Sequence, residues 1–245
     1  MNIKFINNKP FIEGVCINDI INFHSTPFYL YSQKIITETY KDLKDNLSSE
    51  IFFAIKANSN QAILTLLKKC GAGADVVSSG ELKRSIKAGF EPNKIIFEGV
   101  GKSKEDIEYA IEQNIRLINI ESIDELILIN QIGENLNKVI NVGIRLNPDI
   151  DGNTLNKIST GKKTDKFGIG LDQLNNIILL AKSSLNLNLK GISCHIGSQI
   201  HDLKIFEKVF LKADRQMQII EEDNLTFDLS EEEENWEHLY NDLNL

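Results

Sequence analysis

Short apolar runs alternate with longer amphipathic stretches along most of the chain. The apolar runs occupy residues 51–56, 74–78, 94–98, 116–120, 141–146, 190–196 and 225–229. Their near-continuous apolar character is typical of parallel strands that are buried on both faces. Apolar residues at helical spacing follow them at 61–69, 81–88, 104–113, 123–132 and 172–184. Strand–helix units repeated in this order predict an α/β fold with a parallel sheet.

The spacing of these units favours a (β/α)8 TIM-like barrel over a dinucleotide-binding fold, because no GxGxxG follows the first strand. Six units have both a strand and a helix, and the seventh is a strand alone. We therefore expect an incomplete barrel of about seven strands at residues 51–229. Residues 1–50, with a strand at 26–31 and a helix at 33–47, are interpreted as an extension that leads into the barrel. Residues 230–245 are interpreted as a divergent acidic tail.

Composition narrows the class of protein. The chain has 245 residues, of which 42% are hydrophobic and 25% charged, as in ordinary globular proteins. Its net charge of −8 argues against a nucleic-acid or anionic-membrane partner, although most of the excess acid lies in residues 221–245. The three cysteines (Cys16, Cys70 and Cys194) are widely spaced, and we see no signal-peptide pattern and no long apolar run. These features predict a cytoplasmic protein with reduced thiols.

Charged residues follow the predicted strands where a barrel builds its active site. Lys56 ends the first strand, and a partly desolvated lysine there would be a nucleophile toward aldehydes. The alternative is a solvated lysine that closes a strand. Asp75, Glu98 and Arg145 stand at later strand ends. Together they predict a site at the carboxyl edge of the sheet.

Two further segments bear on this site. His195 lies in an apolar strand, where a core histidine is the common alternative, but Gly197 and Ser198 follow it in a turn that could hold an anion. A long polar loop at 147–170 is typical of a binding loop. Residues 99–103 only resemble the end of a Walker A loop, and the histidine spacing predicts no metal site.

Five segments in order resemble the motifs of one enzyme family. They are FAIKANSN (53–60), GADVVSSGEL (73–82), GIRLNPD (143–149), STGKKTDKFGI (159–169) and CHIGSQI (194–200). Together they are similar to the diaminopimelate decarboxylase family, in the pyridoxal-phosphate barrel class that includes ornithine decarboxylase and alanine racemase. The resemblance implies decarboxylation of meso-2,6-diaminopimelate to L-lysine, a step of lysine biosynthesis, with pyridoxal 5'-phosphate as cofactor.

The resemblance also implies roles for residues at the strand ends. Lys56 would bind the cofactor covalently, and Asp75 and Glu81 would orient that lysine and its surroundings. His195 would stack on the pyridine ring of the cofactor. These four residues are the expected catalytic set.

Cofactor and substrate contacts follow from the same resemblance. Gly197 and Ser198 would contact the phosphate, and Arg145 would lie near the ring. Lys166, Phe167 and Gly168 would border a small amino-acid substrate.

The sequence departs from the family pattern after the seventh strand. A phosphate-binding glycine triplet is expected there, but Ser230 and the glutamates at 231–234 occupy its place. The eighth strand, an EPGR segment and a C-terminal β-domain that forms the family's homodimer do not follow. We therefore expect a truncated chain, for which a one-base frameshift near codon 230 is one origin. The alternatives to a decarboxylase are a non-catalytic pyridoxal-phosphate barrel and a non-functional fragment.

Overall fold

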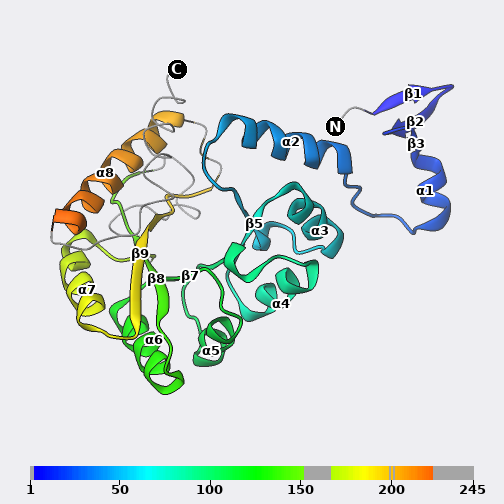
Figure 1. Ribbon diagram of the computed structural model, residues 1–245. Coiled ribbons are helices and arrows are strands. Elements are labelled where there is room, and N and C mark those ends of the chain that lie inside the picture. The colour runs from blue at the N-terminus through cyan, green and yellow to red at the C-terminus, as the bar shows by residue number, and fades with distance from the viewer. Residues whose placement is uncertain (1–2, 152–166, 199, 201, 223–245) are drawn as a thin grey trace.

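A parallel α/β architecture is present in the computed structural model, which describes residues 3–151, 167–198, 200 and 202–222 (Figure 1). The elements are β1 (Lys4–Ile6), β2 (Lys9–Ile12), β3 (Val15–Cys16), α1 (Ile17–Phe23), α2 (Gln33–Asn46), β4 (Phe52–Ala54), η1 (Ile55–Ala57), α3 (Gln61–Cys70), β5 (Gly73–Val76), α4 (Ser79–Ala88), η2 (Pro92–Lys94), β6 (Ile95–Phe97), α5 (Lys104–Glu112), β7 (Leu117–Ile120), α6 (Ile123–Leu136), β8 (Ile140–Leu146), α7 (Leu171–Ser183), β9 (Leu187–Cys194) and α8 (Leu203–Glu222). The predicted α/β class is therefore confirmed.

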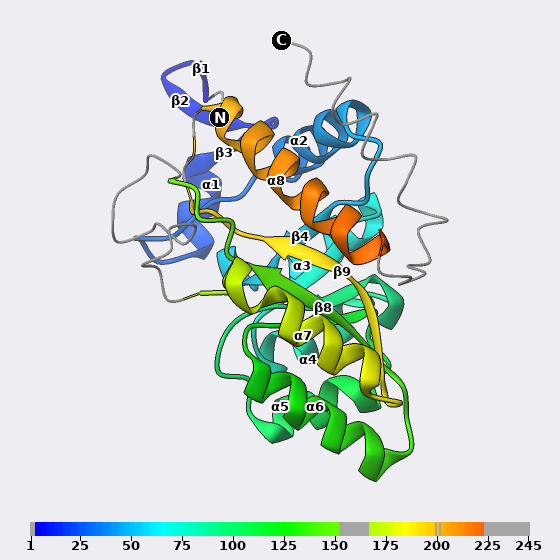
Figure 2. The same ribbon diagram turned by 90° about the vertical axis from the view of Figure 1, so that its left-hand side faces the viewer.

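Strands β4 to β9 form one sheet in chain order, and every neighbouring pair is parallel. Helices α3 to α8 lie on an arc around these strands, as Figure 1 shows. Figure 2 shows β8 and β9, with α7 and α8 beside them. The six described strands thus have the order and curvature of a barrel wall. The expected seventh strand, at 225–229, lies outside the described residues.

The two faces of the sheet differ in chemistry, because successive residues of a strand point to opposite faces. Ala74 and Val76 of β5, and Val142 and Ile144 of β8, belong to the main apolar core with the helices. Polar residues occupy the alternate positions: Asp75, Glu98, Asn119, Arg145 and Ser193. The opposite face of the sheet is therefore polar, and it is the face on which a site can form.

Serine side chains fix the starts of several helices at the carboxyl edge of the sheet. Ser103 forms a capping box with Asp106 at the start of α5. Ser122 accepts the Glu125 N–H at the start of α6, at a distance of 3.2 Å. These caps satisfy helix N–H groups beside the strand ends and so fix the loops that carry the polar residues.

The N-terminal extension differs from the prediction. Strands β1 to β3 form an antiparallel sheet that the hydrophobic pattern did not reveal, and α1 follows it. The strand predicted at 26–31 is wrong, because this segment pairs with no described strand and Tyr29 within it is 90% exposed. Helix α2 confirms the prediction at 33–47. Glu13 joins the small sheet to α2 by accepting hydrogen bonds from the Ser32 hydroxyl and the Lys34 N–H.

No helix among the described residues is both long and apolar enough to cross a membrane.

Candidate functional site

The carboxyl ends of the strands bring most of the predicted site residues together. Lys56 follows β4, Asp75 lies in β5, Glu98 follows β6, Arg145 lies in β8 and His195 follows β9. Their charges act on one another: those of Glu98, Lys56 and Arg145 all affect the pKa of Asp75. The charges of Arg145 and Lys56 also lower the pKa of His195. Residues far apart in sequence therefore form one electrostatic cluster.

Asp75 is the most perturbed carboxyl group of this cluster. Burial raises its pKa to about 7, and the negative charge of Glu98 adds to the effect, while Lys56 and Arg145 oppose it. Its Oδ1 atom is buried and has no hydrogen-bond partner in the structure. A buried carboxyl group that titrates near neutral pH can hold or release a proton, which is a common property of catalytic groups.

Lys56 lies in the one-turn 3-10 helix η1 and not at the end of β4, so the predicted strand 51–56 is too long. Ile55 is fully buried, and its carbonyl accepts the Asn58 N–H at 3.1 Å, which turns the chain. Asn60 then caps α3 by accepting the Ala62 N–H. The Lys56 side chain is exposed and not partly desolvated as expected. Its amine is accessible at the edge of the cluster.

Arg145 is buried and carries the positive charge at the centre of the site. Its guanidinium pairs with the carboxylate of Glu121, which is also buried. The ring of Phe167 lies 5.3 Å from the guanidinium carbon of Arg145, which is the spacing of a cation–π contact. The Gly168 N–H donates to Glu121 Oε2 at 3.1 Å. Two residues of the predicted substrate segment thus contact the cluster, while Lys166 lies outside the described residues.

The segment after β9 supplies a histidine and a turn. Burial lowers the pKa of His195, and the positive charges of Arg145 and Lys56 lower it further, so the imidazole is neutral at neutral pH. Gly197 has a φ of +136°, which favours glycine, and Ser198 is exposed. Burial raises the pKa of the neighbouring Cys194 to about 12, which keeps that thiol protonated and unreactive.

Glu81 has a clear local contact at the start of α4. Its carboxylate accepts the Val77 N–H at 2.9 Å, and its own N–H donates to the Ser78 hydroxyl. Its negative charge also raises the pKa of Asp75, so it lies close to the cluster. Its expected role toward Lys56 stays a prediction.

Sequence reasoning missed the buried ion pairs that support the site. Lys102, in the segment that resembles a Walker A loop, donates to Glu125 at 2.7 Å and to the carbonyls of Gly99 and Asn119, both at 2.6 Å. Glu121 was missed as well, although it stands between β7 and the cap residue of α6. Its place at a strand end is the same signal that identified Glu98 and Arg145.

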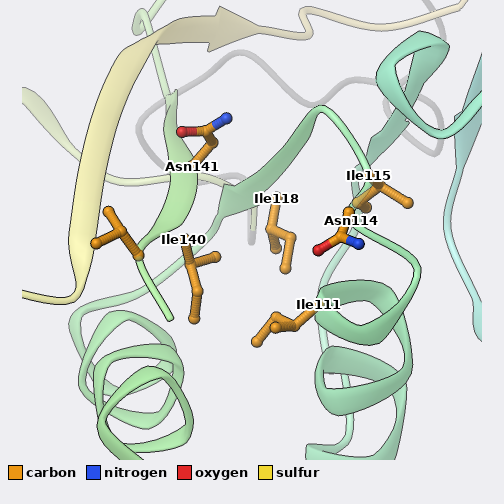
Figure 3. A pocket seen from close by; sticks show the side chains of 7 residues that line it. Ile111, Asn114, Ile115, Ile118, Ile140 and Asn141 are labelled. Carbon is orange, nitrogen blue, oxygen red and sulfur yellow. The ribbon is translucent and has the colours of Figure 1, made fainter. Parts of the chain in front are cut away.

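A separate cavity of about 190 Å³ lies at the amino ends of β7 and β8 (Figure 3). Its lining is Ile111, Asn114, Ile115, Ile118, Val139, Ile140 and Asn141. Asn141 already hydrogen-bonds the Arg116 carbonyl and the side chain of Asn188. None of these lining side chains is ionisable, and the cavity lies at the end of the sheet opposite the charged cluster, so it offers no group for acid–base catalysis.

The charged cluster lies within a segment that matches a known protein family. Residues 33–230 match the family model described as "Pyridoxal-dependent decarboxylase, pyridoxal binding domain". The chain belongs to this family. The resemblance drawn from the five motifs is therefore confirmed, as are the barrel class and pyridoxal phosphate as the family's cofactor.

Individual relatives carry the name that the motifs suggested. Diaminopimelate decarboxylase of Haemophilus influenzae is 35% identical over 226 residues, which are 91% of this chain and 54% of that protein. That of Zymomonas mobilis is 41% identical over 202 residues, 80% of this chain and 48% of that protein. The crystal structure of diaminopimelate decarboxylase from Helicobacter pylori complexed with L-lysine matches with a TM-score of 0.85 and 35% identity, covering 93% of this chain and 62% of that chain. The chain thus spans about half the length of the curated relatives it matches.

Proposed function

We propose that the charged cluster binds pyridoxal 5'-phosphate, with Lys56 as the point of covalent attachment. The cofactor presents an aldehyde, an aromatic ring and a phosphate dianion. The accessible amine of Lys56 suits the aldehyde, and the neutral imidazole of His195 suits the ring. The Gly197 turn and the exposed Ser198 hydroxyl suit the phosphate. The residues present therefore fit the cofactor.

The observation that carries this proposal is the unpartnered Oδ1 of Asp75, buried in the same cluster as Lys56 and Arg145. A buried acceptor without a partner is destabilising, so a ligand that satisfies it has a physical reason to bind there. Asp75 would hold or release a proton at Oδ1. When bound, pyridoxal phosphate supplies an electron sink for the bond that breaks at the substrate α-carbon.

We further propose that the substrate is meso-2,6-diaminopimelate and the products are L-lysine and carbon dioxide. Relatives with this name support the proposal, as does the lysine complex of the Helicobacter pylori protein. Arg145 would attract a negatively charged group of the substrate or cofactor, and the Phe167 ring beside it would exclude water. Association into a homodimer stays a prediction.

The test is covalent labelling of the full chain. We would incubate it with pyridoxal phosphate, reduce it with borohydride, digest it and map the label by mass spectrometry. The label is expected on Lys56, to be lost in Lys56→Ala and to remain in Lys87→Ala, which removes an exposed lysine of α4. Absence of label from Lys56 in the wild-type chain would contradict cofactor binding. Labelling without release of carbon dioxide from diaminopimelate would favour the non-catalytic pyridoxal-phosphate barrel.

A further inference from the structure

The carboxylate of Glu121 joins two parts of the chain that lie far apart in sequence. Its Oε1 pairs with the Arg145 guanidinium of β8, and its Oε2 accepts the Gly168 N–H at 3.1 Å. The Glu121 side chain is 4% exposed and that of Arg145 is 11% exposed. Water therefore has little access to replace either contact.

The segment of residues 167–169 is held against the end of β8 by several contacts. The Ile169 N–H donates to the Arg145 carbonyl, and the Asn147 N–H donates to the Ile169 carbonyl, both at 2.8 Å. Gly168, with a φ of +77°, lies so close that an added Cβ would meet the Arg145 carbonyl oxygen at 3.0 Å. The Glu121 contact at Gly168 thus completes a closely fitted backbone crossing beside the Arg145 guanidinium.

Glu121 is itself fixed from the opposite side. Its N–H donates to Glu125 Oε2 at 2.9 Å, and Glu125 Oε1 pairs with Lys102 Nζ at 2.7 Å. The carboxylate position is therefore set by β7 and the first turn of α6, which are part of the rigid sheet–helix core. This arrangement gives Glu121 a fixed place from which to hold a more peripheral segment.

We propose that Glu121 is a positioning residue, which holds the Arg145 guanidinium and the 167–169 segment together at the ligand site. For its ligand, the inference rests on the proposed binding of pyridoxal phosphate. Both carboxylate oxygens are needed, because each accepts one N–H donor. A glutamine at this position keeps the shape but replaces one acceptor with an NH2 donor and removes the negative charge, so both the Arg145 guanidinium and the Gly168 N–H lose their charged acceptor.

Hydrogen exchange of the Gly168 amide measures the contact directly. Phe–Gly occurs once in the sequence, so 13C-carbonyl phenylalanine with 15N-glycine gives a 13C–15N peptide bond only at Gly168, which identifies its signal among the 15N-labelled glycine amides. Its exchange rate is expected to rise about tenfold in Glu121→Gln, since a hydrogen bond to a charged acceptor is lost. Glu112→Gln makes the same change at an exposed position on α5 and should leave the rate unchanged. The Gly73 amide, bonded to the Ile51 carbonyl at 2.9 Å, reports whether the sheet is intact.

The affinity for the cofactor distinguishes a positioning role of Glu121 from a merely structural one, because a merely structural role would leave this affinity unchanged. Titration with pyridoxal phosphate is expected to give a dissociation constant about tenfold higher in Glu121→Gln than in wild type, with Gly73 equally protected in both. Unchanged Gly168 exchange would overturn the inference, and so would unchanged affinity in a protein that binds the cofactor. If the wild-type chain binds no cofactor, the proposed function fails, and Gly168 exchange alone decides the role of Glu121.

A folding defect would not block the test. Glu121→Gln leaves the Arg145 guanidinium buried without its partner, which is strongly destabilising. If Gly73 also loses protection, the double variant Glu121→Gln/Arg145→Gln removes that charge and is compared with Arg145→Gln alone. Faster Gly168 exchange in the double variant would support the inference, and equal exchange in the two would overturn it.

Discussion

Lys102 offers a sharp test of how the site is supported, because its ammonium group is almost completely enclosed. The side chain is 1% exposed and that of its partner Glu125 is 10% exposed. Its three acceptors all lie within 2.7 Å: Glu125 Oε1 and the carbonyls of Gly99 and Asn119. Methionine at position 102 keeps most of the apolar stem and removes the charge and all three hydrogen bonds.

The expected loss follows from these contacts. Removing one member of a buried ion pair costs about 3–5 kcal/mol, because the other charge stays buried without compensation. In Lys102→Met, Glu125 would be that charge. The two carbonyls lose donors as well, but the terms are not additive, so we expect the free energy of unfolding to fall by about 3–5 kcal/mol in total.

Equilibrium unfolding in urea, followed by circular dichroism, would measure this loss. Lys102→Met is expected to lower the urea midpoint by about 1–2 M at an unchanged slope. Lys87→Met, at an exposed position of α4, should change the free energy of unfolding by less than about 0.5 kcal/mol. The double variant Lys102→Met/Glu125→Gln should recover part of the loss, because it removes the uncompensated carboxylate. A loss below about 1 kcal/mol in Lys102→Met would refute this reasoning.

Three further predictions concern Asp75, Gly168 and Gly143. The pKa of Asp75 rises from 3.8 to about 7 on folding, so this residue should lower stability progressively as the pH rises from 4 to 7. Thermal unfolding at pH 8 should therefore show Asp75→Asn to be more stable than wild type, and an advantage that does not shrink toward pH 4 would contradict the assignment. Gly168→Ala should raise the dissociation constant for pyridoxal phosphate, because the added Cβ would meet the Arg145 carbonyl oxygen and Gly168 has a positive φ. Unchanged affinity would show that the 167–169 segment can shift away from β8 without loss of binding. Gly143→Ala would place a Cβ 2.0 Å from Asn119 Oδ1 and should lower the unfolding temperature by several degrees, whereas an unchanged temperature would mean that Asn119 moves freely.

Local pattern was enough to predict most of the barrel wall. Each helix from α3 to α7 overlaps a predicted stretch, because amphipathic spacing reflects the burial of one helical face. The strand predicted at 26–31 is absent because an apolar run of this kind forms a strand only where a neighbouring strand is available to pair. The small sheet of β1 to β3 escaped notice because its strands are only two to four residues long.

The candidate site, too, could be predicted only in part from the sequence. Lys56, Asp75, Arg145 and His195 could be selected from sequence, since the carboxyl ends of parallel strands meet at one edge. Their mutual effects on pKa could not, because such effects depend on distances and burial across strands that the chain order does not specify.

The amino-acid sequence alone was sufficient to predict the order of the strand–helix units, the family motifs and most of the residues that meet at the carboxyl edge. It did not reveal that Glu121 joins Arg145 to Gly168 or that Lys102 is a buried partner of Glu125, which became evident from the folded chain. These contacts link residues 23 to 47 positions apart, so no local pattern encodes them. The physical reason is that ion pairs and hydrogen bonds depend on three-dimensional distance, whereas hydrophobic periodicity records only which side of each element is buried.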